Sequence, residues 1–248
     1  MNEKEQHETE LAEMSLDKET PFYNEQRAKI IAKILKKENI NRVLDVGCGL
    51  GKVTVHLAKS GFDVTGIDVS EPLIALAKKK AEENGIQINF EIKRIEEFET
   101  KDKFDGILFA GVLEHIEDDV AMMAAARRLL KHNGKIMITD KPTFNCLFTE
   151  RDRRIGHVRR YTKKMLYLKL KSAGYKDIKL KYYNFLMLFA SIYLKITKKD
   201  EYPYEKLNPI VNKLMYWWYK YLENHFIFPI GDRLFAIATV KEDNRERK

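Results

Sequence analysis

Three glycines at alternate positions, Gly47, Gly49 and Gly51, directly follow an apolar run that contains Asp45. Glycine reaches backbone angles that other residues avoid, and it lets a ligand lie against bare main chain. The carboxylate of Asp45 would repel a pyrophosphate but attract an ammonium group. The loop therefore predicts a ligand that is cationic at this end. A dinucleotide fingerprint would need a glycine at the position of Lys52.

A second acid, Asp68, ends the next apolar run. A carboxylate at the end of such a strand can accept hydrogen bonds from the 2′- and 3′-hydroxyls of a ribose. Its distance from the glycine loop, about 20 residues, is the one expected for a ribose-binding acid. Asp45 and Asp68 together indicate a ligand with a cationic end and a nucleoside end.

A histidine, His115, follows the apolar run of residues 104–110 and the glycine after it. Histidine titrates near neutral pH, so His115 could take a proton from a hydroxyl group during a transfer reaction. The alternative is that His115 only packs and hydrogen-bonds beside the ligand. The neighbouring Glu114 is expected to be structural.

The elements that must position these residues follow from the local patterns. An apolar run, a glycine loop and a helical pattern at 52–59 predict a strand, a tight loop and a helix, which open a βαβ unit. Residues 104–110 form a nearly continuous apolar run, which is typical of a buried strand of a parallel sheet. Ligands bind at the carboxyl ends of such strands, where all the candidate residues fall.

On these motifs the chain resembles the class I S-adenosylmethionine-dependent methyltransferases, in the type 11 or ubiquinone-biosynthesis-like branch. The resemblance implies an α/β fold, a doubly wound seven-stranded mostly parallel sheet of the Rossmann-like methyltransferase type with a reversed final strand. It also implies methyl transfer from S-adenosylmethionine. The matching segments are residues 43–51, 66–70, 104–116 and 129–136.

The resemblance also implies a role for each residue of the cofactor site. The residues expected at the methionine end are Asp45, Gly47, Gly49, Gly51 and Arg27, with Asp68 and Val69 at the ribose, Ile95 at the adenine and Ala110 and Gly111 along the floor. The family usually carries an acid and a small residue where this chain has Arg94 and Ile95. Recognition of adenine is therefore expected from the backbone N–H of Ile95.

The formal net charge of +8 is concentrated in one stretch, because residues 141–181 contain thirteen Lys or Arg and three acids. This stretch would suit a nucleic acid or form an ordinary solvated face. It includes an irregular segment, 142–161, that is expected to lie over the active site. Its string Gly-His-x-Arg-Arg-Tyr supplies the expected substrate contacts, with a structural ion-pair cluster as the alternative: His157, Arg159, Arg160 and Tyr161.

Residues 184–232 form an aromatic-rich stretch that is expected to be a helical insertion. It would act as a lid or a dimer surface, or it would contact a membrane peripherally, because Trp and Tyr favour the lipid headgroup region. The methyltransferase domain is expected over 21–183 and 233–248, after a flexible acidic tail at 1–20. The oligomeric state is left open between monomer and homodimer.

The chain has two cysteines, which predicts neither a disulfide framework nor a zinc cluster, and no metal is expected. The first residues lack a secretory leader pattern, so a cytoplasmic protein is expected, with peripheral membrane association open. The predicted function is O-methylation of a small-molecule or of a lipid- or glycan-linked acceptor. An RNA-directed methyltransferase and a non-catalytic cofactor-binding protein are the alternatives.

Overall fold

The computed structural model describes residues 21–140, 147–198, 213–214, 217–223 and 229–241. The expected tail over 1–20 lies outside these described residues, as do Cys146 and much of the expected insertion. Within 184–232 the structure shows the helix α8 (Phe185–Thr197) and the short π-helical segment η4 (Trp218–Glu223). No helix in the described part of the chain is long and apolar enough to cross a membrane.

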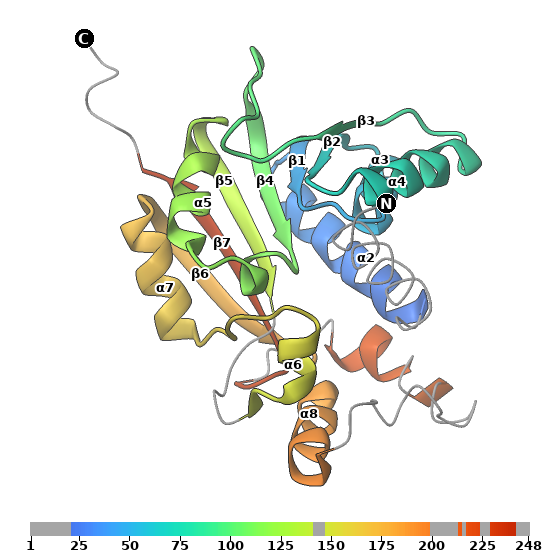
Figure 1. The fold of residues 1–248 in the computed structure, drawn as a ribbon, viewed down its shortest axis with the longest axis vertical. Helices are drawn as coiled ribbons and strands as arrows, with labels where there is room; N and C mark the ends of the chain where they lie inside the picture. The colour runs from blue at the N-terminus through green and yellow to red at the C-terminus, as the bar shows by residue number, and fades with distance from the viewer. Residues whose placement is uncertain (1–20, 141–146, 199–212, 215–216, 224–228, 242–248) are drawn as a thin grey trace.

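Seven strands form one sheet in the order β3-β2-β1-β4-β5-β7-β6 (Figure 1). Strands β1 to β5 are parallel, whereas β7 runs antiparallel to both of its neighbours. The predicted doubly wound, mostly parallel sheet with a reversed final strand is therefore confirmed. The strands are β1 (Arg42–Val46), β2 (Asp63–Asp68), β3 (Asn89–Ile92), β4 (Phe104–Ala110), β5 (Leu130–Asp140), β6 (Tyr175–Tyr183) and β7 (Arg233–Val240).

Helices cover both faces of this sheet (Figure 1). The residues of α2 and α3 pack with one face, and those of α5 and α7 pack with the other. The chain passes from β1 outward to β3 and then returns to β4 on the other side of β1. Such a reversal leaves a ligand crevice at the carboxyl ends of β1 and β4. The helices are α2 (Pro21–Lys37), α3 (Lys52–Lys59), α4 (Glu71–Glu83), α5 (Asp119–Arg127), α6 (Glu150–Arg154) and α7 (Lys163–Ser172).

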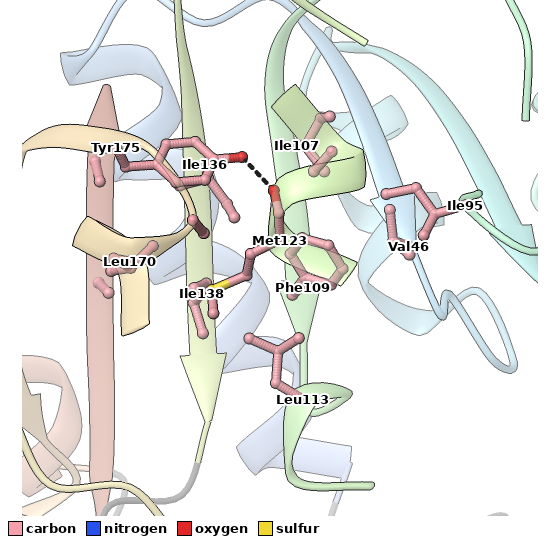
Figure 2. Packing of buried hydrophobic residues seen from close by; sticks show 14 of the residues in the cluster. Val46, Ile95, Ile107, Phe109, Leu113, Met123, Ile136, Ile138, Leu170 and Tyr175 are labelled. Atoms are coloured by element: carbon pink, nitrogen blue, oxygen red, sulfur yellow. Dashed lines mark hydrogen bonds between the residues drawn. The ribbon is translucent and has the colours of Figure 1, made fainter. Parts of the chain in front are cut away.

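The alternation of side chains along β4 explains why both faces need a cover. Ile107 and Phe109 point into the core under α5 and α7, whereas Leu108 points into the core under α2. Figure 2 shows the first of these cores, in which the Tyr175 hydroxyl donates a hydrogen bond of 2.9 Å to the carbonyl of Met123. The centre of the sheet is therefore buried on both faces, and it ends in the loops that carry the candidate site.

One element differs from its expected length. The pattern of apolar residues predicts a helix from Asp118 to Lys131, but α5 ends at Arg127. Leu130 instead pairs with Phe104 at the start of β5. The Arg128 guanidinium donates hydrogen bonds of 2.7 Å to two carbonyls of the loop after β3, which fixes the turn. Tertiary pairing thus overrides the helical pattern in the last turn.

Candidate functional site

The glycine loop follows the carboxyl end of β1 and is hydrogen-bonded to the end of β2. The N–H groups of Gly47 and Cys48 donate to the Ile67 carbonyl at 2.8 and 3.0 Å. Gly49 has a φ of 52°, and a Cβ added there would meet nothing within 4 Å. A Cβ at Gly47, by contrast, would lie 2.6 Å from a methyl group of Val112. The loop therefore packs tightly on the segment after β4 and offers open backbone at Gly49.

The carboxylate of Asp68 holds the same loop from the end of β2. One of its oxygens accepts the Gly49 N–H at 2.9 Å, and the other accepts the Ser70 N–H at 3.0 Å. A carboxylate has about four acceptor positions, so each oxygen can accept a further hydrogen bond. Asp68 thus shapes the loop and retains the capacity for the diol contact that the sequence predicts.

A buried acid, Asp45, and a half-buried arginine, Arg27, lie close enough to interact electrostatically. Asp45 is 1% exposed, and its Oδ2 accepts a hydrogen bond of 2.7 Å from Thr54. Its Oδ1 makes no hydrogen bond with the described residues, and neither does the buried Nε of Arg27. Arg27 donates through Nη2 to the carbonyl and hydroxyl of Thr139, at 3.2 and 2.9 Å. This pair fits a zwitterionic ligand, such as the ammonium and carboxylate of an amino acid.

Burial raises the pKa of Asp45 from 3.8 to about 6, against the hydrogen bond from Thr54 and the charge of Arg27. A carboxyl with that shift costs the folded state about 3 kcal/mol when it is ionised. Because the folded-state pKa is the higher one, stability is lost as the pH rises from about 4 to 6. We expect Asp45→Asn without ligand to be more stable than the wild type at pH 7.5, by up to about 3 kcal/mol.

Urea unfolding at pH 7.5 and at pH 4 checks this expectation, since most of the difference should disappear at the lower pH. The same variant should bind a cationic ligand more weakly, because its amide carries no charge. A variant that is less stable than the wild type at pH 7.5 would show that burial of this carboxylate is not costly.

The remaining residues expected at the cofactor border the same edge of the sheet. Val69 follows β2 and exposes 64% of its surface, which provides an apolar surface for a flat ring. Ile95 is buried in the loop after β3, where its carbonyl accepts from Arg128. Ala110 ends β4, and a Cβ at Gly111 would lie 3.2 Å from the Arg27 guanidinium. The structure therefore brings Arg27, Asp45 and Gly111 together.

His115 is exposed and ends η1 (Leu113–His115), a single turn of 3-10 helix beyond β4. Its Nδ1 lies 3.2 Å from the Gly156 carbonyl. A carbonyl oxygen can only accept, so the neutral imidazole carries its proton on Nδ1. The Nε2 atom then keeps its lone pair. The geometry therefore suits a base that acts through Nε2.

The structure places the Gly-His-x-Arg-Arg-Tyr string inside the protein. Tyr161 is 0% exposed, and its single O–H is shared between the Leu113 carbonyl at 3.0 Å and the Asp119 carboxylate at 2.5 Å. Arg160 is 4% exposed and is paired with Asp152. These contacts favour the structural ion-pair cluster over the substrate contacts expected from the sequence. A substrate-contact role of His157, Arg159, Arg160 and Tyr161 stays a prediction.

Sequence reasoning missed the acids that organise this cluster. Asp152 and Asp119 are both buried, and each accepts from several side chains. Burial opposes the ionisation of Asp152, but hydrogen bonds from His157 and Arg160 outweigh it and hold the pKa of Asp152 below its usual range. An isolated acid in a basic loop carries no sequence signal for burial. Burial and the nearby carboxylates of Asp45 and Asp68 raise the pKa of the Cys48 thiol, which disfavours its reactive thiolate form.

Comparison with known proteins identifies a family to which the sequence is similar. Residues 37–205 match the family model described as "Methyltransferase domain". A ubiquinone biosynthesis O-methyltransferase of Xylella fastidiosa is 40% identical over 100 residues, which are 40% of this chain and 41% of that protein. The chain thus spans less than half the length of this curated relative in the match.

Solved structures share the fold at low sequence identity. An S-adenosylmethionine-dependent methyltransferase from Clostridium acetobutylicum has a TM-score of 0.60 at 13% identity, and the match covers 90% of this chain and 94% of that one. Phosphoethanolamine N-methyltransferase 2 of Haemonchus contortus, in complex with S-adenosyl-L-methionine, has a TM-score of 0.57 at 21% identity. That match covers 82% of this chain and 49% of the other.

Proposed function

The chain belongs to the methyltransferase domain family, and from this membership we propose that it transfers a methyl group from S-adenosylmethionine to a hydroxyl oxygen. The proposed acceptor is a small molecule or a lipid-linked compound. The observation that carries the proposal is the position of His115, which lies beyond the carboxyl end of β4 with Nδ1 held by the Gly156 carbonyl.

The residues at the carboxyl edge fit the cofactor. Asp45 and Arg27 offer a buried acceptor and a buried donor for the ammonium and carboxylate of its methionine part. Asp68 retains acceptor capacity for the ribose, and Val69 presents an exposed apolar surface for the adenine. When bound, S-adenosylmethionine supplies a methyl group that its sulfonium already activates.

The protein's own task is then to align the acceptor and to remove its proton. A neutral hydroxyl must lose a proton as its oxygen gains the methyl group, whereas a neutral amine attacks with the lone pair it already has. His115 accepts that proton on Nε2, the nitrogen that the Gly156 carbonyl leaves without hydrogen. An O-methyltransferase among the similar proteins supports the same acceptor atom.

The acceptor class is supported by the surface of α8 and η4. Phe189 and Ile196 of α8 expose 57% and 75% of their surfaces, and Trp217, directly before η4, exposes 53%. Phe185 of α8 stacks on Trp218 of η4 with ring centroids 6.3 Å apart, so the two elements share one apolar region. An exposed apolar region of this kind suits a lipid-linked acceptor or peripheral contact with a membrane surface.

The basic stretch at 141–181 is less suited to binding a nucleic acid than its net charge indicates. Five of its thirteen cations are paired with carboxylates, which leaves less free charge for phosphates. The paired residues are Arg153, Arg159, Arg160, Lys169 and Lys179. This pairing favours the small or lipid-linked acceptor over an RNA.

The test uses purified protein, ¹³C-methyl S-adenosylmethionine and three fractions of a cell extract: lipids, aqueous small molecules and total tRNA. We expect the label in one of the first two fractions, as a methoxy carbon by NMR. Label in tRNA, or on nitrogen, would contradict the proposed acceptor. Cofactor binding without label in any fraction would instead support the non-catalytic alternative.

A further inference from the structure

We propose that residues 156–161, the clamp segment, position His115 and fix which of its nitrogens carries the proton. The inference rests on the proposed role of His115 as the base, and it extends that role to residues that touch no reacting atom. His157 and Asp152 are the positioning residues, because they anchor the clamp segment at the point where its carbonyl meets His115.

The clamp segment binds each residue of η1. Gly156 offers its carbonyl to the imidazole of His115, whereas Val158 and Tyr161 donate to the carbonyls of the two preceding residues. The distances are 3.2 Å from His115 Nδ1 to Gly156 O, 2.8 Å from Val158 N to Glu114 O, and 3.0 Å from the Tyr161 hydroxyl to Leu113 O. The turn that carries the base is therefore held along its whole length.

Arg159 holds the chain that follows this turn. Its guanidinium donates to the carbonyl of Ile116, to that of Glu117 at 2.6 Å, and to the carboxylate of Asp119 at 3.1 Å. Burial opposes the charge of Arg159, but Tyr161 and Asp119 outweigh it and raise the pKa of the guanidinium. The loop between β4 and α5 is thus fixed on both sides of His115.

The clamp segment is itself anchored to Asp152 of α6. The Asp152 carboxylate accepts from His157 Nδ1 at 3.1 Å and from Arg160 at 2.8 and 3.2 Å. The His157 N–H also donates to the Asp152 carbonyl at 2.8 Å. All three side chains are buried. Because His157 directly follows Gly156, this anchor fixes the peptide whose carbonyl faces His115.

The two imidazoles also touch. The ring of His157 meets that of His115 edge to face, with centroids 4.7 Å apart and planes at 74°. The contact fixes the plane of His115, and the carbonyl of Gly156 fixes its tautomer. A base that is pre-oriented in this way needs no rearrangement when the acceptor binds.

Nitrogen NMR of the imidazoles tests the proposal without any acceptor. We expect the neutral His115 ring of the wild type to carry its proton on Nδ1. In His157→Phe, which keeps the ring contact but removes the donor to Asp152, the proton should move largely to Nε2. His157→Asn keeps a donor and should keep the wild-type tautomer. Val158→Ala, which alters an exposed side chain of the same segment, is the matched control.

Turnover gives a second readout. For His157→Phe we expect kcat to fall about tenfold, with the affinity for S-adenosylmethionine unchanged and near-normal kcat in His157→Asn. A wild-type His115 protonated on Nε2, or a folded His157→Phe with an unchanged tautomer, would overturn the proposal. If His157→Phe does not fold, Arg159→Gln takes its place, and an unchanged His115 tautomer in that variant would overturn the proposal as well.

The role of the clamp segment and the role of His115 as the base can be disproved independently of each other. An expected tautomer shift together with normal turnover in His115→Ala would leave the clamp standing and remove the base. An unchanged tautomer together with lost turnover in His115→Ala would leave the base standing and remove the clamp.

Discussion

We expect His115→Ala to lose about 10²-fold or more in turnover, while its affinity for S-adenosylmethionine stays unchanged. A loss in turnover of this size is typical when a general base is removed. The affinity should be spared because the charged groups that fit the cofactor, Arg27, Asp45 and Asp68, come from α2, β1 and β2, whereas His115 lies beyond β4. Single-turnover kinetics with the extract fraction that takes up the labelled methyl group measure turnover. Calorimetric titration with S-adenosylmethionine measures the affinity independently.

His132→Ala is the matched control, because His132 lies near the start of β5, away from the carboxyl edge of the sheet. It should leave both quantities unchanged. Near-normal turnover in His115→Ala would mean that His115 only packs beside the cofactor, which is the alternative that the sequence leaves open.

The second large effect is expected at Asp68. In Asp68→Ala the affinity for S-adenosylmethionine should fall by about 1 to 3 kcal/mol, or roughly 5- to 150-fold. Two losses combine in this variant. The ribose loses a charged acceptor, and the N–H groups of Gly49 and Ser70 lose the carboxylate that orders the loop. Calorimetric titration of the purified variant measures the change.

Asp63→Ala controls for the removal of an acid from the same strand, because Asp63 begins β2 and Asp68 ends it. The Asp63 side chain is exposed and forms a surface ion pair with Arg42, at 3.6 Å. Surface pairs of this kind contribute about 0 to 1 kcal/mol. Unchanged affinity is therefore expected for Asp63→Ala, and the same result for Asp68→Ala would remove Asp68 from the site.

The sheet and the glycine loop could be predicted from the sequence because their signals are local. The apolar runs, the alternating glycines and the acid at the end of β2 each occupy a few consecutive residues. In a parallel sheet, the ends of such runs fall at one edge, so the sequence predicts that Asp45, Asp68 and His115 lie in the same region. The sheet order and the reversal of β7 confirm the fold that the resemblance implied.

The cluster around His115 could not be predicted, because it depends on pairs that are far apart in the sequence. Tyr161 meets Asp119 and Arg159 meets Ile116 across about 40 residues. A basic string beside a predicted active site has the same composition whether its side chains point to a substrate or into the protein. Burial decides between these roles, and it follows from the anchor at Asp152.

The boundary between α5 and β5 could not be predicted for the same reason, because it depends on a contact with a residue that is distant in the sequence. Leu129 and Leu130 continue the helical pattern of α5, yet Leu130 joins the sheet opposite Phe104. The pairing partner lies in β4, so no window of sequence around Leu130 contains the deciding contact. Local periodicity predicts the end of a helix poorly where the same residue can instead pair with a neighbouring strand.

The most direct test of the account is calorimetric titration of the purified chain with S-adenosylmethionine and, separately, with NAD. We expect binding of S-adenosylmethionine in the micromolar range and no binding of NAD, because the buried carboxylate of Asp45 favours a cation over a pyrophosphate. Binding of NAD alone, or of neither ligand, would contradict the assignment of the glycine loop and with it the roles of Asp45, Asp68 and His115.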